Sequence, residues 1–188
     1  MDTDSFARLI APVKSRMFET VWRILRHRQD SEDALQNALT TVWRQRARIA
    51  RHAAPQALML KICADAAIDQ FRRRRRRRDK QDISAVEVGL CSARPSPMDD
   101  AIGQETLEII MEAISRLSPK QATAVVMRFI QGECDATIAA ALGCGTETVR
   151  EHLDRGRERL GRMLGRLAPH GRSLANTAKT HLPEENER

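Results

Sequence analysis

The sequence predicts an all-α protein in which two small helical domains are joined by a flexible linker. No segment alternates apolar and polar residues for long enough to predict a strand, whereas apolar residues recur every three or four positions over much of the chain. The length of 188 residues suits one ordinary domain or two small ones. Formal charge is also uneven: residues 1–78 carry a net +10, residues 79–117 a net −5 and residues 118–188 a net +2.

The first domain is expected over residues 5–78. One helix should run over residues 6–26, and Asp30 has the side chain of an N-cap for a second helix, with Asp33 in its first turn. That second helix is expected to bury Ala34, Leu35, Ala38, Leu39, Val42 and Trp43. A third helix should begin at Pro55, a residue suited to the first helical position, and continue into the seven arginines Arg72–Arg78.

The middle of the chain predicts a linker and the remainder a second domain. Residues 79–103 contain Gly89, Pro95 and Pro97 without a sustained helical period, which favours a linker. The domain that follows, residues 104–168, should form helices over 106–117, 119–130, 135–142 and 146–164. The turn Gly143-Cys144-Gly145 joins the last two helices, which is typical of a helix-turn-helix. Residues 169–188 are expected to be a disordered tail.

Several classes of function are disfavoured by what the sequence lacks. It has no Gly-rich phosphate loop, no H-E-x-x-H and no G-x-S-x-G, so we do not expect an enzyme. Its four cysteines form no C-x-x-C pair and no zinc-like spacing with histidine, so we expect no metal and no cofactor. No run of about 18 apolar residues and no signal peptide is present, which predicts a cytoplasmic protein without membrane insertion.

The second helix of the helix-turn-helix carries the candidate contacts to duplex DNA. Val149 and Leu153 should face the core and leave a polar face that fits the major groove. The candidate contacts are Thr146, Glu147, Thr148, Arg150, Glu151, His152, Arg155 and Arg157. Arg150 is suited to reading guanine, and Arg155, Arg157 and Arg159 to holding phosphates. The alternative is an ordinary helical hairpin with a solvated face, in which Glu151 and Arg155 form an i,i+4 pair.

Two further features of the first domain need an explanation. Seven consecutive arginines exceed what a helix C-terminus needs for capping, which favours a polyanion as partner. A stripe of acidic and amide residues at the start of the second helix is unexpected on a basic domain, and it suggests docking to a basic protein. The stripe comprises Asp30, Glu32, Asp33 and Gln36. Capping together with solvation would also account for these residues.

In order along the chain, these motifs resemble one known family. The D-x-E-D-x-x-Q stretch from Asp30 is followed by I-x-x-x-x-x-x-D from Ile62, the arginines, L-S-P-K-Q from Leu117, and T-V-R within the helix-turn-helix. Over roughly residues 5–166 the chain resembles a bacterial sigma factor of the extracytoplasmic-function (ECF) class, which retains conserved regions 2 and 4. Such a protein gives RNA polymerase its choice of promoter.

The resemblance implies partners and a role for each motif. Asp30, Glu32, Asp33 and Gln36 match the segment that docks on the clamp helices of the largest subunit of RNA polymerase. The segment that opens and reads the −10 promoter element is matched at Asp65, Asp69, Arg72, Arg73 and Arg74. Residues 117–157 match the domain that reads the −35 element and touches the polymerase flap. A cognate anti-sigma factor is a further expected partner.

The chain departs from the family pattern at four positions. A tryptophan is usual at the position of Leu58, a glutamate at that of Thr137, and a capping serine or threonine at that of Gly145. Asp65 replaces an asparagine that commonly helps to hold an unpaired base. Asp65 either accepts a hydrogen bond from a base amino group, such as cytosine N4, or lies in solvent and offsets part of the arginine charge.

Two other functions compete with promoter selection as part of polymerase. A helix-turn-helix regulator that binds duplex DNA as a dimer without polymerase would explain the second domain, but it leaves the acidic stripe without a role. A decoy that binds only an anti-sigma factor would not need the arginine-rich surface.

Overall fold

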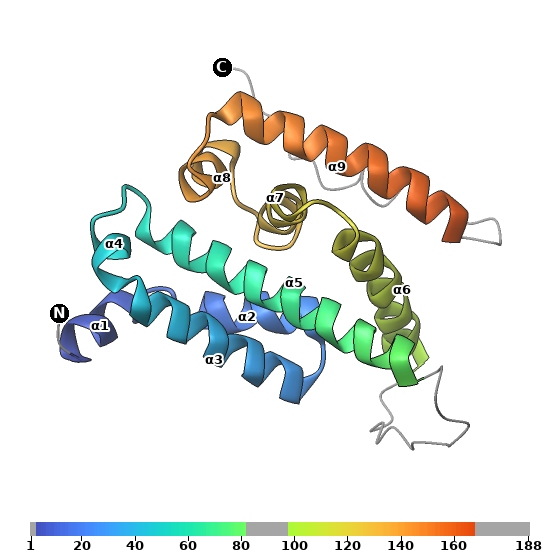
Figure 1. Cartoon of the computed structure of the whole chain (residues 1–188), viewed down its shortest axis with the longest axis horizontal. Coiled ribbons are helices and arrows are strands. Elements are labelled where there is room, and N and C mark those ends of the chain that lie inside the picture. The colour runs from blue at the N-terminus through green and yellow to red at the C-terminus, as the bar shows by residue number, and fades with distance from the viewer. Residues whose placement is uncertain (1–2, 82–97, 168–188) are drawn as a thin grey trace.

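The structure is a computed structural model that describes residues 3–81 and 98–167 (Figure 1). Helices make up nearly all of these residues. They are α1 (Thr3–Ile10), α2 (Lys14–Leu25), α3 (Arg28–Arg44), α4 (Arg46–Ala50), α5 (Pro55–Gln81), α6 (Met98–Ser115), α7 (Pro119–Phe129), α8 (Asp135–Leu142) and α9 (Thr146–Leu167). No strand occurs within those two ranges, which confirms the all-α prediction. None of these helices is long and apolar enough to cross a membrane.

The single helix predicted over residues 6–26 is wrong, because a turn at residues 11–13 divides it into α1 and α2. Pro12 explains the break, since proline has no amide hydrogen and disfavours helical geometry at the residue before it. The second half ends at Arg26, whose φ of 46° is left-handed and whose amide donates to the Trp22 carbonyl.

The predicted N-cap of the second helix is also wrong. Helix α3 begins at Arg28, and the His27 side chain takes the capping position by accepting a hydrogen bond from the Asp30 amide. Asp30 therefore lies inside the first turn, where a carboxylate complements the helix dipole.

At the other end of α3, the core predicted from the sequence extends one residue too far. Ala34, Ala38 and Val42 are buried and Leu35 and Leu39 are partly buried, but Trp43 is 37% exposed. The Trp43 ring lies at the rim, with the Phe6 ring edge-on at 4.8 Å and the Arg46 guanidinium 4.3 Å from its centroid. The short helix α4 that follows was not predicted.

Helices extend into both ends of the predicted linker. Helix α5 starts at Pro55 as expected but continues to Gln81, and α6 begins at Met98, eight residues before the predicted start at residue 106. The rest of that linker, and the predicted tail over residues 169–188, lie outside the described residues.

Helix α7 lies between α5 and α9 (Figure 1), and its central residues are buried on all sides. All seven residues from Gln121 to Met127 are buried. This central stretch has no solvent face, because one side packs on the helix-turn-helix and the other on α5, whereas Lys120, Arg128 and Phe129 at the two ends of α7 are exposed. Pro119 stands in its first turn, as the sequence predicts, although Ser118 makes no side-chain capping bond.

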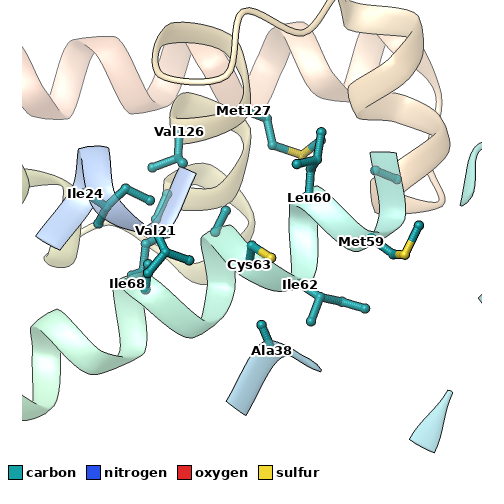
Figure 2. Packing of buried hydrophobic residues seen from close by; sticks show 14 of the residues in the cluster. Val21, Ile24, Ala38, Met59, Leu60, Ile62, Cys63, Ile68, Val126 and Met127 are labelled. Atoms are coloured by element: carbon teal, nitrogen blue, oxygen red, sulfur yellow. The ribbon is translucent and has the colours of Figure 1, made fainter. Parts of the chain in front are cut away.

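The buried apolar residues form one cluster to which both halves of the chain contribute. Figure 2 shows Val126 and Met127 of α7 beside Leu60 and Cys63 of α5 and Val21 of α2. At about 25 cal/mol per Å² of apolar surface removed from water, contacts of this kind stabilise the packing of α7 on the N-terminal helices.

Candidate nucleic-acid interface

A cleft of about 920 Å³ runs along α5. Its floor is α5, one wall comes from α3, α4 and the loop after α4, and the other wall comes from α7 and the end of α8. Its charged lining is mostly cationic, with Arg44, Arg48, Lys61, Arg72, Arg73 and Lys120 against Asp65 and Asp69. A cleft with this excess of cations attracts phosphate groups.

Asp65 lies in this cleft with both carboxylate oxygens engaged. Oδ2 is 2.6 Å from the Lys61 ammonium, and Oδ1 accepts a hydrogen bond of 2.6 Å from the Thr123 hydroxyl of α7. The sequence shows Asp69 four residues after Asp65, but the charge partner lies four residues before it. Lys61 was therefore a missed site residue that i,i+4 spacing indicates, whereas no local pattern indicates Thr123, 58 residues away.

The arginines of α5 have different surroundings. Arg72 donates to the carbonyl oxygens of Ser115 at 2.9 Å and Leu117 at 3.1 Å, at the end of α6, and also contacts Asp69 at 3.4 Å. Cations and donors at a helix C-terminus satisfy carbonyls that have no partner within the helix. Arg73, in contrast, is exposed.

The next two arginines pair with acidic side chains of other helices. Arg74 is only 17% exposed and lies 3.3 Å from both Asp30 and Glu108. Arg75 lies 2.5 Å from Glu112 of α6. The arginine run is therefore partly neutralised within the chain.

The acidic stripe on α3 divides into an inner and an outer part. The Asp30 side chain is 15% exposed, because it accepts from Gln70 at 2.9 Å and pairs with Arg74. Glu32 and Gln36 are exposed and Asp33 is half-buried. The structure thus brings Glu32, Asp33 and Gln36 to one surface of α3 and directs Asp30 toward α5.

The helix-turn-helix has the predicted turn. Gly143 is left-handed with φ 66° and ends α8, and the amides of Gly143 and Cys144 donate to carbonyls of Ala140 and Ala139. This double hydrogen bond is a Schellman motif, which requires the conformation that glycine adopts most easily. Helix α9 then starts at Thr146.

Helix α9 is held against α7 by its apolar face. Val149 and Leu153 are buried, as predicted, and Gly156 lies so close to α7 that a Cβ atom there would be 2.9 Å from Cγ2 of Val125. The close approach at Gly156 sets the distance between the two helices and with it the position of the outer face of α9.

The predicted contact residues of α9 do not all reach that outer face. Thr146, Glu147, Arg150, Glu151, Arg155 and Arg157 are exposed, whereas Thr148 and His152 are half-buried. Both ring nitrogens of His152 are buried without a hydrogen-bond partner, so the imidazole does not point outward with the rest.

Three of the exposed arginines of α9 have contacts within the chain. Arg150 is 3.4 Å from Asp135 and 3.1 Å from Glu147. Arg155 pairs with Glu151 at 3.1 Å, as in the ordinary-hairpin interpretation. Arg157 lies over the Phe129 ring, 5.8 Å from its centroid. These are surface contacts, which are weak enough for a phosphate or a base to displace.

An all-α chain with a basic cleft and a helix-turn-helix defines a DNA-binding protein. The sigma-70 region 4 family matches residues 107–160. SigM of Mycobacterium tuberculosis, an ECF RNA polymerase sigma factor, is 31% identical over 140 residues, which is 74% of this chain and 66% of that protein. This chain therefore spans about two thirds of the length of SigM.

Other relatives match over more of their length. The sigma-E factor of Streptomyces coelicolor is 26% identical over 82% of this chain and 83% of its own, and CarQ of Myxococcus xanthus is 27% identical over 87% and 91%. The chain belongs to the ECF family of RNA polymerase sigma factors.

Two solved structures share the fold. RpoE of Bartonella quintana, solved with the anti-sigma factor NepR, has a TM-score of 0.50 and 21% identity over 87% of this chain and 98% of its own. CnrH, solved with the cytosolic domain of CnrY, has a TM-score of 0.52 and 15% identity over 88% and 90%.

Proposed function

We propose that this chain binds core RNA polymerase and directs promoter-specific initiation of transcription by reading the −10 and −35 elements. The observation that carries the proposal is a basic cleft and a helix-turn-helix on one chain of the ECF sigma family. Its role is binding and strand opening, without covalent chemistry by the protein, and its place of action is the cytoplasm.

The outer part of the acidic stripe is the proposed contact to polymerase. Glu32, Asp33 and Gln36 share an accessible surface of α3 and lie outside the DNA cleft. Carboxylates on an otherwise basic half of the chain favour a partner of opposite charge, such as basic residues on the clamp helices of the largest subunit. Asp30 supports this surface from within by its pairs with Gln70 and Arg74.

Residues 5–78 form the proposed unit that reads the −10 element. Capture of a base from a melted strand costs a few kcal/mol of unstacking, and the cationic lining of the cleft offsets part of that cost through phosphate contacts. Asp65 is the proposed base contact, with Asp69, Arg72 and Arg73 beside it in the cleft. Arg74, also predicted as a contact to the −10 element, lies outside the cleft lining and pairs with Asp30 and Glu108 instead. Arg73 is the most accessible of these arginines for a phosphate.

Residues 104–168 form the proposed unit that reads the −35 element through α9 and touches the polymerase flap. Arg150 is the proposed base contact and Arg155 and Arg157 the proposed phosphate contacts, because Arg150 lies in the first turns of the helix. Residues 79–103 are the proposed connection between the two units. A cognate anti-sigma factor is a proposed partner, supported by the structural neighbour RpoE of Bartonella quintana, which was solved with the anti-sigma factor NepR.

Run-off transcription on fragmented genomic DNA tests the proposal directly. Core polymerase is incubated with and without the purified chain, and the 5′ ends of the transcripts are sequenced. New start sites that share upstream elements are expected only when the chain is present. Duplex binding without association with core polymerase would instead identify a regulator that acts alone, and association with an anti-sigma factor only would identify a decoy.

A further inference from the structure

Lys61 and Asp65 form an ion pair on the floor of the cleft. The Lys61 ammonium lies 2.6 Å from Oδ2 of Asp65, and the two side chains are 26% and 39% exposed. Stabilisation of α5 is a weak explanation for this pair, because a cation four residues before an acid is the less favourable orientation of an i,i+4 pair. The helix dipole adds little, since it acts in the first and last turns and this pair lies within a helix of 27 residues.

The two carboxylate oxygens of Asp65 have different partners. Lys61 occupies Oδ2, whereas Oδ1 accepts a hydrogen bond of 2.6 Å from the hydroxyl of Thr123, on the opposite wall of the cleft. Oδ1 therefore accepts from a neutral donor in the cleft while Lys61 stays on Oδ2. The amino group of a base is another neutral donor, and it would take the place of the hydroxyl group.

This arrangement limits the bases from which the carboxylate can accept. A carboxylate with both oxygens free can accept from N1–H and N2–H of guanine together. With Oδ2 occupied by Lys61, the remaining oxygen suits a single exocyclic amino group, such as N4 of cytosine or N6 of adenine. The ammonium has three hydrogens, so it can also donate to the ring nitrogen beside that amino group on the Watson–Crick edge of a flipped base. The N3–H of thymine lies between two carbonyl oxygens, which repel a carboxylate.

Lys61 also compensates the charge of Asp65. Asp69 is the next carboxylate along this face of α5, and its cation is Arg72 at 3.4 Å. Without Lys61, Asp65 and Asp69 would be an unfavourable i,i+4 pair of like charges, and Asp65 would repel the phosphates of a bound strand. The ion pair therefore keeps a strong acceptor in the cleft without that repulsion.

We infer that Lys61 is a specificity-determining residue of the unit that reads the −10 element, and that its pair with Asp65 accepts cytosine or adenine and rejects guanine. The inference rests on the proposed function, because it takes Asp65 as the base contact. Lys61 acts as a positioning residue for the carboxylate and as a second donor to the base. Together the two side chains supply the acceptor and the donor that one asparagine carboxamide offers.

A promoter library randomised across the −10 element tests the inference in the complex with core polymerase. The wild-type chain is expected to enrich cytosine or adenine and to deplete guanine at one position, and sequencing of the transcribed templates shows which of the two bases is preferred. Lys61→Met removes the ammonium and leaves both oxygens of Asp65 free for N1–H and N2–H. It should therefore reduce the discrimination against guanine at that position by roughly tenfold.

Three further variants separate this role from a loss of charge or of fold. Arg48→Met removes a cation from the same cleft, whereas the described contacts of Asp65 are with Lys61 and Thr123, so transcription should fall for all sequences alike. Lys61→Arg keeps a cationic donor and should keep the rejection of guanine. In an Asp65→Ala background, Lys61→Met should leave the base profile unchanged. Circular dichroism establishes that each variant retains its helices.

The outcomes separate failure of this inference from failure of the proposed function. Equal base profiles for Lys61→Met and Arg48→Met, in chains that direct initiation, would overturn the role of Lys61 and leave the proposed function intact. If the wild-type chain directs no initiation, the proposed function fails, and selection of single strands from a random pool by the full-length chain decides the inference. Enrichment of guanine by Lys61→Met relative to the wild-type chain would uphold base reading by the pair, and identical pools would overturn it.

Discussion

The contact between α9 and α7 gives a sharply defined prediction at Gly156. An alanine there would bring its Cβ to within 2.9 Å of Cγ2 of Val125, a β-branched side chain that is itself 3% exposed. Gly161 lies in the same helix with nothing within 4 Å of its Cβ position. Both substitutions raise helix propensity by about 1 kcal/mol, so Gly161→Ala is expected to stabilise the protein by about that amount.

At Gly156 the gain in propensity is opposed by overpacking, which costs about 1–3 kcal/mol in a well-packed core. The net expectation for Gly156→Ala is therefore a loss of about 0–2 kcal/mol. Val125 has one strongly preferred rotamer in a helix and is enclosed by buried neighbours, so it has little room to move aside. The two glycine variants should differ by about 1–3 kcal/mol in the free energy of unfolding.

Urea unfolding followed by circular dichroism measures this difference, and thermal midpoints should separate by about 2–4 °C for each kcal/mol. A double-mutant cycle with Val125→Ala identifies the cause, because removal of the two methyl groups makes room for the new Cβ. The coupling free energy should be about 1–3 kcal/mol and favourable. Equal effects of the two glycine substitutions, with a coupling below about 0.5 kcal/mol, would refute the account of this contact.

Three further predictions concern other parts of the molecule. Asp33→Lys combined with Gln36→Lys should weaken binding to core polymerase in a competition assay with little loss of helix content, because both side chains reach the surface of α3; unchanged affinity would contradict the docking assignment. Arg150→Ala should weaken the free energy of DNA binding by about 1–3 kcal/mol and relax base preference at one upstream position. Arg157→Ala should instead weaken binding to all sequences equally and reduce the slope of log binding constant against log salt by about one. Identical binding profiles of the two variants on a randomised element would show that base and phosphate contacts were wrongly sorted. Burial, with a smaller contribution from the nearby carboxylate of α5, raises the pKa of the Cys63 thiol from 9.0 to about 12. The unfolded chain therefore binds fewer protons above about pH 9, so stability should fall as the pH rises from about 9 to 12, and urea midpoints of a Cys63→Ala variant should fall less steeply.

Local signals predicted much of the helical framework. Pro55 marks the start of α5, and Gly143 the end of α8, because each residue's backbone geometry suits that one place. The same reasoning, applied to Pro12, would have divided the first helix in two. Its apolar period continued through the break and concealed it.

The candidate site was predicted less completely, because its contacts join distant segments. The pairing of Asp65 with Thr123 and of Arg74 with Glu108 depends on how the halves dock, and helix periodicity shows only neighbours three or four residues apart. Asp30 illustrates the consequence. Its residue type and position predicted a helix cap, whereas in the structure its side chain points toward α5 and accepts a hydrogen bond from Gln70.

The burial of the centre of α7 on all sides has a consequence for how this protein can change. Each side chain between Gln121 and Met127 is enclosed by neighbours, so a substitution there disturbs the packing of α7 against α5, α9 or both. The outer face of α9 carries no such constraint. Under the proposed function, promoter preference is therefore free to diverge through exposed residues of α9 such as Arg150, while the centre of α7 changes slowly as a shared scaffold. In a library of random substitutions selected for folding alone, tolerated changes should be scarce along α7 and abundant on the outer face of α9.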